Sequence, residues 1–423
     1  MTTTAPNLFR RLEQLLAIAS FGAASAFALW IAFILSPEEY GRLMTVQAAI
    51  VIVVSLATMR TYDLSYFAVT QLGASPSKAF RISATVEFAT LVATVAIAFG
   101  ILHFAASLVP ENFSALILLF AAVMLSMGNL QGASVARLRQ AGAVRAILVA
   151  EVISVAAWAA AGALILFGVR DIGRVLLISA APQAVRYLIV LSAAVAHSRK
   201  DGATDEETAP KWQSIVRFLF TGQIANALKN ANTSIETLLV AAFFGPVTVA
   251  MYRVARAIQG APVAALNVLQ QRSYPDLTGE PDLTTKRAIR RTLGREAVGL
   301  ALLFLPICLA VAGLFAWFKP DIDMPHFVML TAAIYISLLP AAYQQAGLAI
   351  LTMSGRNTQV GIAYLAGALV LAIGGGILMV RPEIGILVAT VIMAALLRAV
   401  IVERQASRCL TSTVAPANPR HLP

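Results

Sequence analysis

The sequence predicts an all-α polytopic membrane protein, with twelve transmembrane helices in two six-helix lobes that are related by a parallel pseudo-repeat. Composition is the first indication: the 423 residues are 59% hydrophobic and 13% charged, whereas soluble domains carry about 25% charged residues. The second indication is the presence of twelve apolar runs, because the length of each is close to the roughly 20 residues that a helix needs to cross a bilayer. The connections between the runs are short and leave no room for a globular catalytic domain.

The polar segment 197–213 is the longest strongly polar run outside the loop 271–295. We take it as the linker between lobes, which gives an N-terminal lobe over 1–198, a cytoplasmic linker over 199–213, a C-terminal lobe over 214–405 and a cytoplasmic tail over 406–423. The twelve predicted spans are 15–35, 43–62, 82–105, 113–132, 146–168, 174–196, 216–243, 247–270, 296–317, 326–350, 359–380 and 384–403.

A short internal repeat is the third indication. The first span ends in AFILSPEEYGRL at 32–43 and the seventh in AFFGPVTVAMYR at 242–253. Aligning Pro37 with Pro246 matches an apolar helix end, a small residue before the proline and another small residue four positions after it. Six spans per lobe give both copies the same orientation, which predicts a parallel repeat and a central cleft between the lobes.

The net charge of +11 is explained by topology rather than by nucleic-acid binding. With a cytoplasmic N-terminus, 21 Lys and Arg residues fall on the cytoplasmic side and 5 on the opposite side. This is the positive-inside pattern, and it predicts that both termini are cytoplasmic. The six basic residues that remain fall within spans: Arg186, Arg217, Lys229, Arg253, Arg256 and Arg398.

The seventh span carries a polar face. At about 100° per residue, its polar side chains occupy less than half of the circumference. Such a face needs an environment other than lipid, and a charge at this depth costs about 3 kcal/mol or more on insertion scales. We therefore expect this face to line a transport pathway. Its members are Gln223, Asn226, Lys229, Asn230, Thr233, Glu236 and Thr237.

Other spans add polar groups. The eighth contains Arg253 and Arg256, with a kink expected at Pro262; the sixth contains Arg186. Two glutamines, Gln344 and Gln345, follow Pro340 in the tenth. For Arg253 the alternative is that it snorkels to the headgroups. A purely structural contact between helices is the alternative for Arg186 and Lys229.

Carboxylates within spans are candidate ion-coupling groups. We select Glu236 first and Asp63 second, and interpret Glu87 and Glu151 as structural or close to the interface. Enzymatic chemistry is not indicated, since the sequence contains no Walker A motif. The two cysteines and four histidines are scattered, so we expect no metal and no cofactor.

Two motifs resemble those of the bacterial polysaccharide flippases, which belong to the multidrug/oligosaccharidyl-lipid/polysaccharide exporter superfamily. One is LSPEEYG at 35–41. The other is SIETLL at 234–239, continuing to Gly245-Pro246 and MYRVA at 251–255, with Tyr274-Pro275 beyond. The chain departs from the family in having Glu236 where aspartate is common and Ala250 where glycine is common.

The resemblance implies a flippase that carries a polyprenyl-pyrophosphate oligosaccharide across the bacterial inner membrane by alternating access, for surface polysaccharide synthesis. Lys229, Arg253 and Arg256 then neutralise pyrophosphate, and Asn226, Asn230, Gln344 and Gln345 bind sugar hydroxyls. Arg186 is a further substrate-binding candidate. Implied partners are membrane lipids, a polysaccharide polymerase and glycosyltransferases, with no nucleic acid. Two alternatives stand: an ion-coupled multidrug exporter of the same superfamily, and an integral-membrane glycan polymerase or ligase, which short external loops disfavour.

Overall fold

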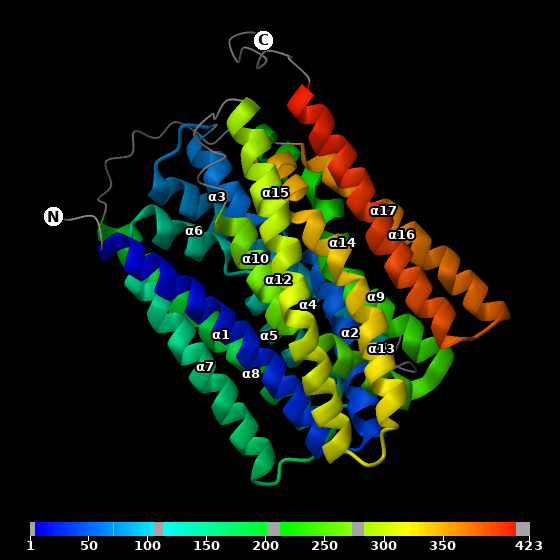
Figure 1. Ribbon diagram of the computed structural model, residues 1–423. Helices are drawn as coiled ribbons and strands as arrows, with labels where there is room; N and C mark the ends of the chain where they lie inside the picture. The colour runs from blue at the N-terminus through cyan, green and yellow to red at the C-terminus, as the bar shows by residue number, and fades with distance from the viewer. Residues whose placement is uncertain are drawn as a thin grey trace.

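The computed structural model describes residues 5–70, 72–104, 113–200, 212–272, 283–354 and 356–411, and every regular element in these ranges is a helix. Figure 1 shows the helices as a bundle of long, tilted rods, with α1, α7 and α8 on one side and α16 and α17 on the other. The predicted all-α fold in two lobes is therefore confirmed.

The N-terminal lobe contains eight helices that form six membrane-crossing segments. Two segments consist of a pair of consecutive helices, α2 with α3 and α5 with α6. The bounds are α1 Ala5–Ile34, α2 Pro37–Ala57, α3 Thr61–Thr70, α4 Pro76–Phe104, α5 Ala115–Asn129, α6 Gly132–Gln140, α7 Val144–Leu166 and α8 Ile172–Lys200.

The C-terminal lobe is built in the same way. Its helices are α9 Trp212–Ile258, α10 Gly260–Arg272, α12 Leu283–Phe318, α13 Met324–Ile336, α14 Leu338–Tyr343, α15 Gln345–Met353, α16 Asn357–Val380 and α17 Ile384–Thr411. The helix α9 is two helices in one, because Gly245 has φ 78° and ψ 177°. Side chains on either side of Gly245 hydrogen-bond to each other, so the chain reverses there.

Ten helical stretches among the described residues are long and apolar enough to cross a membrane, and one of them runs through the reversal at Gly245. Dividing that stretch and adding α1, whose apolar part is Gly22–Ile34, gives the twelve expected segments. The chain is thus a multi-pass membrane protein.

The start of α2 explains one half of the repeat. Ser36 and Glu39 form a capping box, in which the Ser36 hydroxyl accepts from the Glu39 N–H and the Glu39 carboxylate accepts from the Ser36 N–H. Pro37 occupies the first turn, where its missing N–H costs nothing. The second half of α9 begins in the corresponding way at Pro246.

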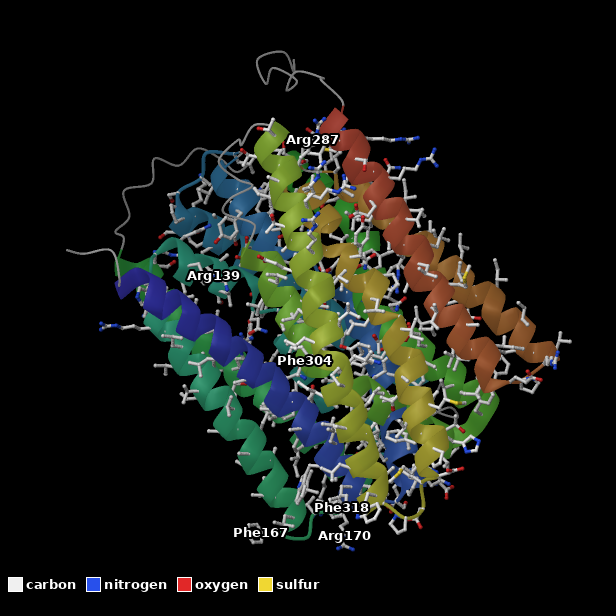
Figure 2. The ribbon with its side chains drawn as sticks, viewed as in Figure 1. Arg139, Phe167, Arg170, Arg287, Phe304 and Phe318 are labelled. Carbon is white, nitrogen blue, oxygen red and sulfur yellow. The ribbon has the colours of Figure 1, made fainter. Side chains whose placement is uncertain are left out.

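The two ends of the molecule differ in charge. Arg287 lies near one end and Arg170 at the other in Figure 2. We call the end with Arg60, Arg139 and Arg287 the basic end; it is the end that the positive-inside pattern assigns to the cytoplasm. The other end carries the loops that follow α1, α7 and α12, and we call it the opposite end.

The lobes contact each other at both ends. At the opposite end, the Lys319 ammonium donates to the carbonyls of Ala32 and Phe33 in the last turn of α1 and of Leu35 just after it, at 3.2, 3.0 and 2.8 Å. Burial lowers the pKa of Lys319, although Asp321 and Glu39 oppose this effect.

The helices α2 and α9 also come close to each other. A methyl group on Gly41 would lie 1.8 Å from the Pro246 carbonyl oxygen, so the two helices contact each other through their backbones.

At the basic end, the contacts involve the break between α2 and α3. The Gln223 amide donates to the carbonyls of Leu56 and Thr58 at 2.9 and 3.1 Å. Arg60, within the break, donates to the Asn357 side chain at the start of α16 at 2.8 Å. Hydrogen bonds therefore join the two lobes on both sides of the membrane.

Candidate functional site

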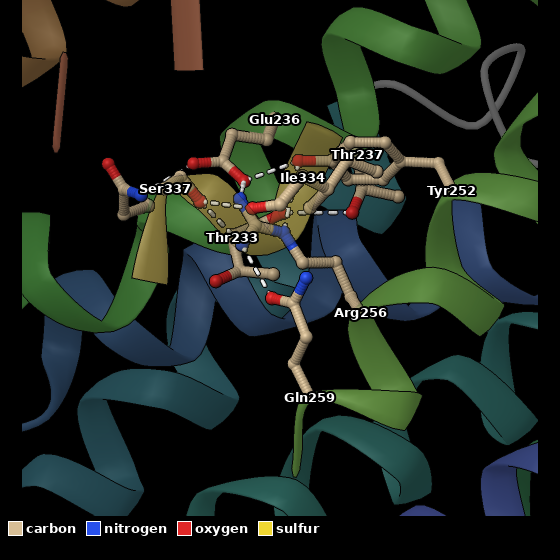
Figure 3. A network of polar contacts seen from close by, with 9 residues as sticks. Thr233, Glu236, Thr237, Tyr252, Arg256, Gln259, Ile334 and Ser337 are labelled. Atoms are coloured by element: carbon tan, nitrogen blue, oxygen red, sulfur yellow. Dashed lines mark hydrogen bonds and ion pairs between the residues drawn. The ribbon is translucent and has the colours of Figure 1, made fainter. Parts of the chain in front are cut away.

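The polar centre of the C-terminal lobe is formed by the α9 hairpin (Figure 3). Glu236 is fully buried. Its carboxylate accepts from the Asn232 amide at 2.8 Å and from the Tyr252 hydroxyl at 2.5 Å. The two carboxylate oxygens are therefore held by donors from both arms of the hairpin.

Arg256 completes this centre. Its guanidinium forms an ion pair with Glu236 and donates to the Tyr252 hydroxyl at 3.2 Å. It also lies 3.2 Å from the Gln259 side-chain oxygen and 3.4 Å from the Ser337 hydroxyl. A buried charge is tolerated when it is paired and its remaining donors are satisfied, and both conditions hold here.

Two predicted site residues with different predicted roles thus meet. Arg256 is predicted to bind substrate and Glu236 to couple an ion, yet each neutralises the other in this structure. The reversal at Gly245 explains the pairing, since Glu236 lies nine residues before it and Arg256 eleven after it. The Gly-Pro pair in the sequence could have indicated this contact, because residues at similar distances from a hairpin turn face each other.

Lys229 lies on the same face of α9 as Glu236 but has a different environment. Seven residues separate them, which corresponds to about 20° of rotation and about 10 Å along the axis. Glu236 is fully buried, whereas Lys229 is exposed. Neighbouring helices therefore cover this face of α9 at Glu236 but leave it exposed at Lys229, midway along the first arm.

The stripe continues toward the basic end with amide side chains. Asn226, one turn from Lys229, donates to the Thr58 carbonyl, in the break after α2, at 3.0 Å. Gln223 contacts the same break, as described above. These amides bind a carbonyl of the other lobe in this structure. The side chain of Asn230 lies outside the described residues.

Arg253 lies one turn before Arg256 and is half-buried. Its Nε is buried and has no hydrogen-bond partner among the described residues. Tyr40 of α2 is within its electrostatic range, so Arg253 lies near the other lobe.

Gln344 and Gln345 lie at the junction of α14 and α15, where the tenth segment is interrupted. Both side-chain carbonyl oxygens are buried and have no partner among the described residues. Such atoms have unused capacity to accept a hydrogen bond. The structure does not bring them into contact with Lys229 or Arg256.

The N-terminal lobe holds a second polar centre, which contains Arg186. Its guanidinium forms an ion pair with Glu151 of α7 and donates to the Gln131 side chain between α5 and α6. The pairing corresponds to the structural alternative for Arg186. Asp63 is likewise paired, with Arg60. The sequence identified these charges but contained no signal for their partners.

Glu87 of α4 lies in the same lobe and is 1% exposed. One of its oxygens accepts from the Thr61 hydroxyl at 2.6 Å and from the Ala133 N–H at 2.7 Å. Its other oxygen, Oε2, has no partner among the described residues. Within those ranges, no group of three His, Cys, Asp or Glu side chains could hold a metal ion.

The chain matches no protein-family model and no curated protein by sequence. Its fold, however, matches solved structures over nearly its whole length. An outward-facing multidrug resistance MATE family transporter of the MOP superfamily has a TM-score of 0.66 and 13% identity, covering 96% of both chains. The chain has the MATE transporter fold.

Two further structures support the same fold. An inward-facing MATE family transporter of the MOP superfamily has a TM-score of 0.63 and 13% identity, covering 96% of this chain and 100% of its own. A MOP superfamily transporter from Pyrococcus furiosus Vc1 (DSM3638), described by a reverse polarity of its binding pocket that suggests a different function, covers 98% of its own length and 97% of this chain, with a TM-score of 0.62 and 13% identity.

Proposed function

We propose that this protein is a flippase that moves a lipid-linked oligosaccharide, carried on polyprenyl pyrophosphate, across the bacterial inner membrane by alternating access of its two lobes. The observation that carries the proposal is the environment of Lys229. An exposed ammonium halfway along a transmembrane arm, on a face whose other described polar side chains are buried or half-buried, suits an anionic group that passes through the membrane.

The distribution of carboxylates favours an anionic substrate over a cationic drug. Glu236 and Glu151 are buried, but Arg256 and Arg186 neutralise them. A cationic drug would have to displace an arginine from either carboxylate. An anionic pyrophosphate at Lys229 would displace no ion pair among the described residues.

Amide side chains supply the second half of the argument. Sugars present many hydroxyls, and amides both donate and accept hydrogen bonds. Asn226 lies one turn from Lys229 and binds the Thr58 carbonyl across the lobe boundary, so this amide becomes available when the lobes separate. We assign the sugar to Asn226 and its neighbour Asn230, and the lipid tail to the bilayer beside the lobes.

The test compares Lys229→Ala with Lys229→Arg. We expect Lys229→Ala to reduce flipping of lipid-linked oligosaccharide in proteoliposomes at least tenfold, because the pyrophosphate loses its counter-charge. Lys229→Arg should restore most of the activity. The control is Arg381→Ala, which removes an exposed cation at the opposite end and should leave flipping unchanged.

Deletion of the gene provides the cellular measurement. A flippase mutant should lose surface glycan and accumulate the lipid-linked unit on the cytoplasmic face, whatever polymerase and glycosyltransferases act with it. Normal surface glycan together with drug sensitivity would instead support the multidrug exporter, a function consistent with the fold of the solved transporters.

A further inference from the structure

Glu87 is the buried carboxylate that the proposed substrate pathway does not use. Glu236, Glu151 and Asp63 each have an arginine partner, but the groups that contact Glu87 are neutral. The Thr61 hydroxyl and the Ala133 N–H both donate to Oε1 of Glu87, and Oε2 is buried without a partner among the described residues. An ionised carboxylate in this position would have no cation in contact with it in a low-dielectric interior, which is unfavourable.

The hydrogen bonds match a neutral carboxylic acid. In that form one oxygen behaves as a carbonyl and accepts hydrogen bonds, and the other carries the proton. The oxygen that accepts from Thr61 and Ala133 has the first role, which leaves Oε2 for the proton. The resulting hydroxyl has no acceptor among the described residues, but an unpartnered neutral group costs far less than an unpartnered charge. A sodium ion is a poorer fit, because it needs several oxygen ligands, whereas a backbone N–H and a donating hydroxyl surround the other carboxylate oxygen.

Titratable groups lie on several of the helices around Glu87. Those on α3 are Tyr62, whose hydroxyl accepts from Arg139 of α6, Asp63, which is paired with Arg60, and Tyr66. From α8, Tyr187 lies within electrostatic range, and Arg186 is paired with Glu151 of α7. The α5 segment has no titratable residue. The remaining titratable groups on α2, α4 and α6 are Glu38, Glu39, Tyr40, Arg42, Lys78, Arg81, His103 and Arg137.

The position of Glu87 connects two breaks in the helices. Thr61 is the first residue of α3, after the α2–α3 break, and Ala133 is in the first turn of α6, after the α5–α6 break. Glu87 therefore bridges the N-terminal ends of two half-helices, where the backbone dipoles favour negative charge. A change in its charge alters the attraction that holds both ends.

The first of these breaks also contacts the other lobe. Arg60 precedes Thr61 and donates to Asn357 of α16 at 2.8 Å. Movement at Thr61 is therefore passed by one peptide bond to a contact between the lobes at the basic end.

We propose that Glu87 is a proton-binding site that couples proton movement to the rearrangement of the lobes. The step forms an O–H bond on Oε2 with a proton from water on one side of the membrane, and breaks it by returning the proton to water on the other side. This inference rests on the proposed function only in treating the chain as an alternating-access transporter; it does not depend on the substrate.

The experiment measures distance between lobes in the full-length protein in nanodiscs, without substrate. Spin labels are placed at the exposed positions 141, after α6, and 358, at the start of α16, with Cys308 and Cys409 replaced by alanine. We expect the distance distribution to change with pH around one midpoint. Glu87→Gln, which imitates the protonated acid, should remain in the low-pH distribution at every pH.

Two more variants keep the test decisive if Glu87→Gln folds poorly. Glu87→Asp should retain the pH response with a displaced midpoint. Thr61→Val should move the midpoint to higher pH, because the ionised carboxylate loses a donor. The matched control is Glu296→Gln, which neutralises an exposed carboxylate of α12 and should respond to pH like the unmodified protein.

Several results would overturn the proposal. One is a pH response in Glu87→Gln that equals that of the unmodified protein. Another is a distance between the lobes that does not change with pH in the unmodified protein. A response to sodium at constant pH that disappears in Glu87→Gln would assign the site to a metal cation instead. Loss of flipping of the proposed substrate with an intact Glu87-dependent pH response would contradict the proposed function alone.

Discussion

Single residues in this protein differ mainly in whether their charge is already compensated. The sequence identified the membrane-embedded cations Arg186, Lys229 and Arg256 together, because hydropathy and position along a span treat them alike. The residues that pair with the two arginines are far away in the sequence, and a single sequence does not show which distant residues come into contact. The structure separates two paired arginines from an exposed lysine, which is why the substrate proposal rests on Lys229.

The Glu236–Arg256 pair has a consequence for stability. Arg256→Ala removes the counter-charge of a carboxylate that is fully buried, and breaking such a pair costs about 3–5 kcal/mol. We expect a clearly lower midpoint of thermal unfolding in detergent. Arg381→Ala, which breaks an exposed pair with Glu383, should change the midpoint little, since exposed pairs contribute about 0–1 kcal/mol. Equal midpoints for the two variants would contradict this assignment.

At the scale of helices, the sequence predicted long spans better than their interruptions. The reversal at Gly245-Pro246 was placed correctly, and the kink expected at Pro262 corresponds to the break at Gln259 between α9 and α10. The breaks after α2 and α5 were not predicted. The first occurs at Thr58–Arg60, where no glycine or proline marks the end of a helix. The second occurs at Leu130–Gln131, between Gly128 and Gly132, but glycines are also common inside the long spans and do not by themselves mark a break.

The approach of α2 to α9 predicts the effect of a single methyl group. Gly41→Ala would place its Cβ 1.8 Å from the Pro246 carbonyl oxygen, and backbone cannot yield as a flexible side chain does. We expect a loss of about 1–3 kcal/mol, typical of overpacking, measured by thermal unfolding. Gly299→Ala in α12, where a Cβ meets nothing within 4 Å, is the control. A variant as stable as this control would show that the two helices can separate freely.

At the scale of the whole molecule, Lys319 joins the lobes at the opposite end. Lys319→Met removes three hydrogen bonds to α1 carbonyls and should widen the distance between spin labels at the exposed positions 171 and 383. Raising the pH should act in the same direction. Below its lowered pKa the ammonium has three donors for three carbonyls, whereas the amine above it has two.

The variant Arg381→Met is the control for this measurement, because it removes an exposed cation at the same end without affecting α1. A distance that widens equally in both variants, or a lysine variant that keeps the original distance, would exclude Lys319 from a role in holding the lobes together.

The two ion pairs of buried carboxylates described above each join residues of one lobe: Arg186 with Glu151, and Arg256 with Glu236. The contacts between lobes that we describe are hydrogen bonds to carbonyls and to one amide. During synthesis, therefore, the first lobe can compensate the Arg186 and Glu151 charges before the ribosome has made α9. Each of these two ion pairs is complete within its own half, so two separately translated halves would each enter the membrane with that pair already formed.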